Sequence, residues 1–147
     1  MPPAADVPAL IVGVRAVSRV ARLLERATGE LTLAQYRVLS AVDAGDERAS
    51  RIAQRLAVGK PTVSAVVDSL CKRELLTRSD VAEDLRAAAL ALTPLGRTTL
   101  AEVEAAMCAQ LADLVARTPD AHGLLASLGG LDAAIEQRLA ERAADRA

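Results

Sequence analysis

Apolar side chains recur at helical spacing along most of the chain. A first helix is expected over residues 8–27, because apolar positions there follow one another at steps of three and four. These positions are Leu10, Val14, Val17, Ala21 and Leu24. A second helix should begin near Thr32, because Thr32 and Gln35 have the spacing of a capping box.

Residues 50–72 predict two short helices separated by a tight turn at Val58-Gly59. Ser50 is the expected cap of the first helix. The second helix begins at Lys60-Pro61, where the missing N–H of a proline in the first turn costs no hydrogen bond. Its apolar residues recur as i, i+3, i+4, i+7 and should face inward. They are Val63, Val66, Val67 and Leu70.

Strand-like alternation replaces the helical spacing around residues 76–78 and 88–92, with a charged turn at 80–86 between them. Two short helices joined by a tight turn and followed by a hairpin are the elements of a winged helix-turn-helix. The predicted fold class is therefore mainly α with a small β-hairpin wing.

Two long helices are expected after the hairpin. Thr93 followed by Pro94 marks the start of the first, which should end near Thr118-Pro119, and the second should cover about 120–145. Together with the N-terminal helix they hold more apolar surface than one small lobe can cover. This excess predicts a two-fold dimer.

The amino-acid composition argues against several classes of protein. The length of 147 residues favours a single unit, and Tyr36 is the only aromatic residue, so the core must be aliphatic. With no long apolar run and no basic segment ahead of an apolar one, we expect neither a membrane partner nor a secretory signal. Cys71 and Cys108 fit no zinc or disulfide spacing. We therefore expect a reduced cytoplasmic protein with no metal, no other cofactor and no catalytic residues.

Charge is distributed unevenly along the chain. The net charge is −1, but residues 48–86 carry eight basic and five acidic side chains, or +3, whereas residues 87–147 carry five and eight, or −3. Because electrostatic attraction to nucleic acid is local, the positive middle third is the expected DNA-binding part.

The second helix of a helix-turn-helix enters the major groove by its N-terminal end. The polar side of residues 60–72 should therefore face DNA, with Lys60 and Lys72 on phosphates. This side is formed by Lys60, Thr62, Ser64, Ala65, Asp68 and Lys72. Asp68 is expected to pair with Arg73 or Arg78 rather than to read a base.

Four motifs in order make the sequence similar to the MarR (multiple antibiotic resistance regulator) family, over about residues 8–145. They are Val67-Asp68-Ser69-Leu70, Lys72-Arg73-Glu74-Leu75-Leu76-Thr77-Arg78, Asp84-Leu85-Arg86 and Leu92-Thr93-Pro94-Leu95-Gly96. The resemblance implies a single unit, 1–147, with a DNA-binding lobe at 32–93 and dimerisation helices at 8–27 and 94–145. It also implies a homodimeric repressor of a near-palindromic operator on double-stranded DNA, controlled by a small aromatic or phenolic effector.

Site residues follow from the same resemblance. The implied DNA-binding residues are Lys60, Pro61, Thr62, Ser64, Ala65, Lys72, Arg78, Asp84 and Arg86. Arg86 would enter the minor groove, oriented by a salt bridge to Asp84. The implied ligand pocket is formed by Leu10, Val14, Arg15 and Tyr36. Family members commonly have glycine at the position of Glu74, where the recognition helix ends.

Two alternatives stay open at this point. One is a redox-sensing regulator of the same fold, because Cys71 lies beside Lys72 and Arg73 and positive neighbours favour a reactive thiolate. The other is a helical protein-interaction module that no longer binds DNA.

Overall fold

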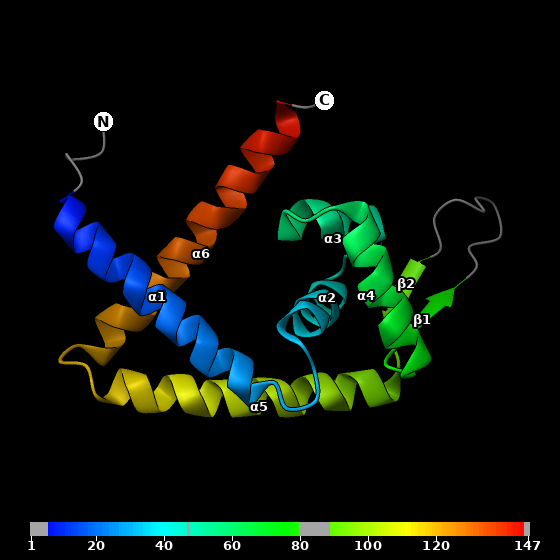
Figure 1. The fold of residues 1–147 in the computed structure, drawn as a ribbon, viewed down its shortest axis with the longest axis horizontal. Coiled ribbons are helices and arrows are strands. Elements are labelled where there is room, and N and C mark those ends of the chain that lie inside the picture. Colours follow the sequence, from blue (N-terminus) through cyan, green and yellow to red (C-terminus); the bar gives the residue numbers. More distant parts are fainter. Residues whose placement is uncertain (1–5, 47, 80–88, 146–147) are drawn as a thin grey trace.

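The structure is a computed structural model that describes residues 6–46, 48–79 and 89–145. Six helices and one hairpin make up these residues (Figure 1). They are α1 (Val7–Ala27), α2 (Leu33–Asp43), α3 (Ala49–Leu56), α4 (Lys60–Lys72), β1 (Leu76–Ser79), β2 (Ala89–Leu92), α5 (Pro94–Ala116) and α6 (Ala121–Ala144). The predicted fold class is confirmed.

The other elements are arranged along helix α5, which runs along the lower edge of the view in Figure 1. Helices α2, α3 and α4 and the hairpin form a lobe over one end of α5. Helix α1 packs against α5, and α6 follows from the other end of α5. Helix α6 then runs back towards the lobe, where its C-terminal half contacts α3. None of the described helices is long and apolar enough to cross a membrane.

The buried core lies in the lobe and at the start of α5. It is built from leucine, valine, isoleucine, alanine and one methionine, which confirms the aliphatic core expected from the composition. Leu39, Ile52 and Leu70 are fully buried at its centre. By contrast, α1 and α6 contain no buried residue. The core therefore stabilises the lobe, while much of the apolar surface of α1 and α6 is exposed in the single chain.

The start of α2 has the predicted capping box. The amide of Gln35 donates to Oγ1 of Thr32 at 3.1 Å, and the amide of Thr32 donates to Oε1 of Gln35 at 2.9 Å. These two bonds satisfy amide donors that the first turn of a helix leaves without partners.

The predicted cap of α3 is wrong. The helix begins at Ala49, the extended residue Arg48 takes the N-cap position, and Ser50 lies inside the first turn. The amide of Ile52 donates to the carbonyl of Arg48 at 3.1 Å, so the helical hydrogen bonds begin two residues earlier than a cap at Ser50 allows. No side-chain cap bond forms at this end.

The hairpin and the start of α5 meet at a close backbone contact. Strands β1 and β2 are antiparallel, with Leu76 opposite Leu92, and Thr93 caps α5 as predicted by accepting a bond from the amide of Gly96 at 2.9 Å. A Cβ atom at Gly96 would lie 2.0 Å from the carbonyl oxygen of Leu75. Glycine at this position therefore lets α5 pack against the entry to β1.

Candidate nucleic-acid interface

Helix α4 has one buried side and one exposed side. Val63, Val67 and Leu70 are at most 1% exposed and fix the helix on the core, whereas Val66 is half-buried. The predicted DNA-facing residues of α4 are all exposed. The inward valine stripe thus holds a polar outward side, as the sequence pattern indicated.

The N-terminal end of α4 is the end expected to enter the major groove. Gly59 occupies its N-cap with an extended backbone, and Pro61 lies in the first turn. Lys60 and Thr62 are exposed beside the amides that this turn leaves without helical partners. Exposed amides and the positive end of the helix dipole both attract phosphate.

An ion pair joins α4 to the wing. The guanidinium of Arg78 in β1 donates to a carboxylate oxygen of Asp68 in α4 at 2.5 Å. Of the two partners expected for Asp68, the structure therefore shows Arg78. Both side chains remain about half exposed, so the pair lies on the surface of the lobe.

A second network fixes the C-terminal end of α4 on α2. The guanidinium of Arg73 donates to Oε1 of Gln35 and to the backbone carbonyl of Glu30, both at 3.3 Å. The side-chain amide of Gln35 donates to the hydroxyl of Ser69 at 3.1 Å. Sequence reasoning missed this network, since the capping-box spacing gives Gln35 a role in its own helix only.

The chain leaves α4 through a left-handed residue. Glu74 has φ of 58°, and its amide donates to the carbonyl of Cys71 at 3.0 Å. A left-handed conformation after a helix favours glycine because a Cβ atom crowds the backbone there. This explains physically why glycine would suit this position better than glutamate.

Other predicted site residues are placed as follows. Asp84 and Arg86 lie outside the described residues, so the predicted minor-groove contact stays a prediction. Leu10, Val14 and Arg15 are exposed on α1 and Tyr36 is half-buried on α2, and the predicted ligand pocket also stays a prediction. Burial raises the pKa of the Tyr36 phenol, with a further upward contribution from Glu104 and an opposing hydrogen bond to Ser40.

Both cysteines carry free thiols. Cys71 is half-buried at the end of α4 and Cys108 is exposed on α5. The structure pairs neither with the other, and the redox role of Cys71 stays a prediction.

The geometry is that of a helix-turn-helix with a wing, and comparison with known proteins agrees. A family model described as "MarR family" matches residues 30–87, which contain α2, α3, α4 and the hairpin entry. This part of the chain is therefore similar to the MarR family, as the sequence motifs indicated. Members of this family are transcriptional regulators and not enzymes.

Solved structures share the fold over nearly the whole chain. The transcriptional repressor CouR, bound to a 23-mer DNA duplex, is 29% identical with a TM-score of 0.72, over 83% of this chain and 88% of that one. Staphylococcus aureus MarR, in complex with salicylate and kanamycin, is 20% identical with a TM-score of 0.76, over 92% and 93%. PcaV from Streptomyces coelicolor, in complex with its natural ligand, is 23% identical with a TM-score of 0.67, over 88% and 90%. No curated protein matches the chain in sequence.

Proposed function

We propose that this protein is a ligand-responsive repressor that binds a near-palindromic operator as a homodimer. The observation that carries the proposal is the exposed polar side of α4, held outward by the buried stripe of Val63, Val67 and Leu70. A helix presented in this way can enter the major groove, where base pairs are distinguishable. The DNA-bound structure of the CouR repressor, which shares this fold, supports the same reading.

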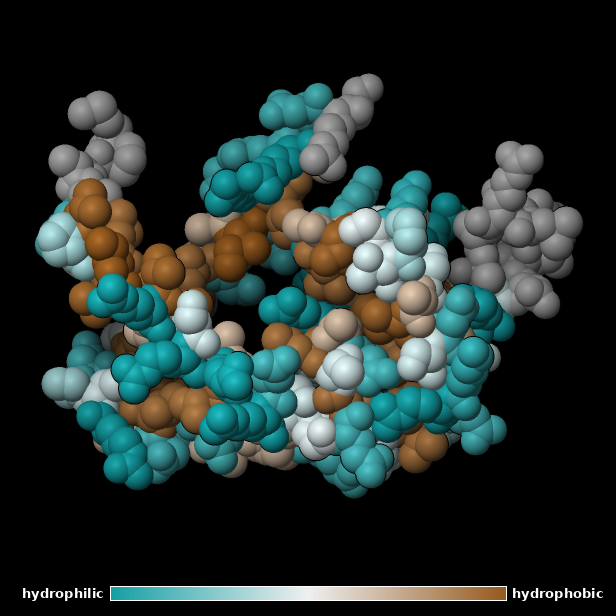
Figure 2. Space-filling view, viewed as in Figure 1, coloured by the Kyte–Doolittle hydropathy of each residue, from teal (hydrophilic) through white to brown (hydrophobic). Residues whose placement is uncertain are grey.

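Dimerisation is supported by uncovered apolar surface. Figure 2 shows hydrophobic side chains gathered over α1 and along α6. The exposed large apolar residues of these helices are Val7, Leu10, Ile11, Val12, Val14, Val17, Leu125, Leu128, Leu131 and Ile135. Because a contiguous apolar patch of this kind marks an interaction surface, a second copy is its natural partner, and a two-fold pair would present two α4 helices to two half-sites.

The proposed DNA contacts divide into three kinds. Lys60 and Lys72, near the two ends of α4, would bind phosphates, and Thr62 and Ser64 would hydrogen-bond base edges or phosphates. The apolar surfaces of Pro61 and Ala65 suit thymine methyl groups. From the wing, Arg78 would contact the backbone and Arg86 the minor groove, with Asp84 orienting Arg86.

Control by a small molecule is supported by the relatives. Staphylococcus aureus MarR holds salicylate and kanamycin, and PcaV holds its natural ligand. For this chain we propose an aromatic or phenolic effector near Tyr36, between the lobe and α1, lined by Leu10, Val14 and Arg15. Tyr36 supplies the one aromatic ring and hydroxyl of the chain.

A binding titration tests the function. The duplex upstream of the protein's own gene and a scrambled duplex of equal length and base composition are titrated at two salt concentrations. We expect the upstream DNA to bind at least a thousandfold more tightly than the scrambled DNA, as sequence-specific regulators do on the order of 10³–10⁷-fold. Equal affinities for the two duplexes at both salt concentrations would exclude sequence-specific DNA binding and favour the alternative of a helical protein-interaction module.

A further inference from the structure

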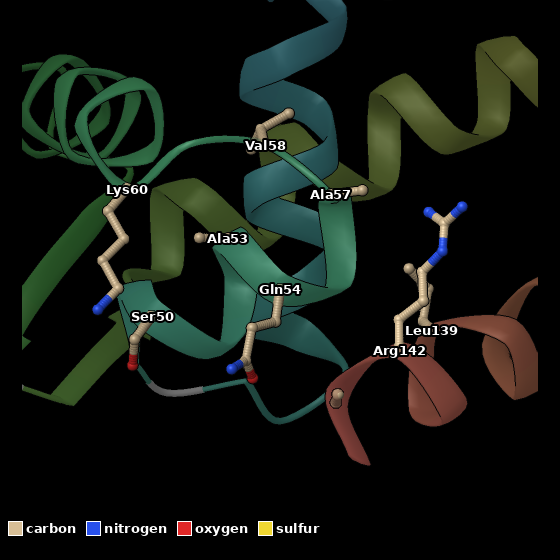
Figure 3. Close-up of a pocket in the computed structure, with 9 residues that line it drawn as sticks. Ser50, Ala53, Gln54, Ala57, Val58, Lys60, Leu139 and Arg142 are labelled. Carbon is tan, nitrogen blue, oxygen red and sulfur yellow. The ribbon is translucent and has the colours of Figure 1, made fainter. Parts of the chain in front are cut away.

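A cavity of about 620 Å³ opens between α3, the turn that leads into α4, and the C-terminal end of α6 (Figure 3). Its volume lies within the range of about 300–1,000 Å³ that is typical of small-molecule sites. It is separate from the α1 and Tyr36 region, because none of those residues lines it.

The lining combines a small aliphatic surface with two cations. Ala53, Ala57, Val58, Leu139 and Ala143 supply the apolar part, and Ser50 and Gln54 supply hydrogen-bonding groups. Lys60 and Arg142 lie on opposite sides of the α3 residues in Figure 3. Of the described residues that line the cavity, none is acidic or aromatic.

Two acids near the cavity share one arginine. Arg55 on the same helix lies 3.2 Å from a carboxylate oxygen of Asp46 and 3.6 Å from one of Glu136 in α6. The single charge of Arg55 offsets one of the two carboxylates, and these ion pairs join α3 to α6 beside the cavity. Neither Lys60 nor Arg142 forms an ion pair with another described residue, so both charges can attract an anion.

We propose that this cavity binds a small aliphatic dicarboxylate, with one carboxylate on Lys60 and the other on Arg142. Carboxylates form short, charge-assisted hydrogen bonds with ammonium and guanidinium groups, and the position of Lys60 at the start of α4 adds the attraction of the helix dipole. The alanine-rich surface accommodates a methylene chain. An aromatic ring would find no ring to stack on among the described lining residues.

Occupation of this site has a consequence for DNA binding, and this step rests on the proposed function. Lys60 cannot hold a ligand carboxylate and a DNA phosphate in the same geometry. A ligand that also contacts Arg142 ties the start of α4 to α6, which belongs to the proposed dimer interface. The dicarboxylate should therefore weaken DNA binding, by a factor in the range of about 5–150 that is usual for coupled sites.

Calorimetry without DNA tests the site itself. Adipate should bind the full-length protein at least about tenfold more tightly than hexanoate, because hexanoate has the same chain length and forms one ion pair instead of two. Arg142→Ala should weaken the affinity for adipate about tenfold. Arg138→Ala removes the same charge from the same helix outside the lining, and it should change the affinity for adipate less than twofold. Ala143→Leu fills the cavity and should abolish binding while thermal unfolding stays cooperative.

Several results would overturn the proposal. They are absence of adipate binding at millimolar concentration, equal affinity for adipate and hexanoate, equal effects of Arg142→Ala and Arg138→Ala, or inorganic phosphate binding as tightly as adipate. The last result would indicate a general anion site.

A DNA titration with and without saturating adipate separates this inference from the proposed function. Adipate should weaken operator binding by the natural protein and leave that of Ala143→Leu unchanged. Adipate binding without any DNA binding would sink the proposed function and keep the site. DNA binding that adipate leaves unchanged would keep the function and disprove the coupling.

Discussion

The guanidinium of Arg78 and the carboxylate of Asp68 lie 2.5 Å apart and join the first strand of the wing to α4. The pair is about half exposed, and a surface pair of this kind contributes about 0–1 kcal/mol to stability. We expect its main effect to be geometric, because it ties β1 to α4. It also places a negative charge on the side that is proposed to face DNA.

Replacing Asp68 separates these two effects. Asp68→Asn should tighten binding to random DNA, since it removes a like charge from phosphate, and should lower the ratio of operator to random affinity about fivefold, or about 1 kcal/mol. Fluorescence anisotropy on both duplexes measures this ratio. Asp113→Asn is the control, because its partner Arg117, the C-cap residue of α5, lies 3.0 Å away and the pair is far from α4 in sequence. A ratio that does not change in Asp68→Asn would show that the ion pair does not orient the wing.

Glu74 offers a stabilising substitution. Its φ of 58° costs a residue with a side chain about 1–2 kcal/mol. Glycine avoids this cost, but its greater freedom in the unfolded chain offsets part of the gain. Glu74→Gly should therefore raise the free energy of unfolding by about 0.5–1 kcal/mol in urea titration. Glu102→Gly, in the middle of α5, should lower it by a similar amount because glycine is disfavoured inside helices. A less stable Glu74→Gly protein would contradict the left-handed backbone at this residue.

Gly96 should tolerate no side chain. The Cβ of Gly96→Ala would lie 2.0 Å from the carbonyl oxygen of Leu75, so α5 must shift away from the hairpin. We expect a loss of about 1–3 kcal/mol in the free energy of unfolding, the usual cost of overpacking. Gly129→Ala in α6 meets nothing within 4 Å and should instead gain about 0.5–1 kcal/mol. Thermal unfolding of the two variants compares them directly, and equal changes would exclude the close contact.

Local chemistry accounts for much of the fold that could be predicted from the sequence. The Thr32–Gln35 capping box, Pro61 in a first turn and Thr93 before Pro94 each act within four residues, and each helix start was predicted correctly. The predicted cap of α3 was wrong because Ser50 is a good cap by residue type, while the N-cap position falls two residues earlier, at Arg48.

The relationships that could not be predicted join residues far apart in the chain. Arg73 is 38 residues from Gln35, and Arg55 of α3 pairs with Glu136 of α6 beside the cavity. Periodicity within one helix identifies which side is buried but not which partner covers it. The exposed side of α4 could therefore be predicted, whereas the network that orients α4 and the cavity beside Lys60 could not.

Tyr36 gives a pH dependence with a definite sign. Burial raises its pKa above the ordinary value of 10.0, so the folded protein favours the neutral phenol. Below pH 10 both states keep the proton and stability is unaffected; as the pH rises through 10 towards the folded pKa, the unfolded state loses its proton first and stability falls. Tyr36→Phe should remove this part of the alkaline loss in urea titrations between about pH 8 and 11. Identical pH profiles for the two proteins would show that Tyr36 does not contribute.

The last prediction separates phosphate contacts from groove reading on the proposed DNA surface. Each neutralised phosphate releases condensed counterions, so Lys60→Ala or Lys72→Ala should reduce the salt slope of log K by about one per half-site and weaken operator and random DNA alike. Arg86→Ala should cost the operator about 1–3 kcal/mol more than random DNA, because minor-groove width depends on sequence. Asp84→Ala is decisive, since an orienting salt bridge to Arg86 predicts weaker operator binding and an acidic wing alone predicts tighter binding. Titration of the two duplexes at several salt concentrations measures all four variants, and tighter operator binding by Asp84→Ala would refute the wing contact that the family resemblance implies.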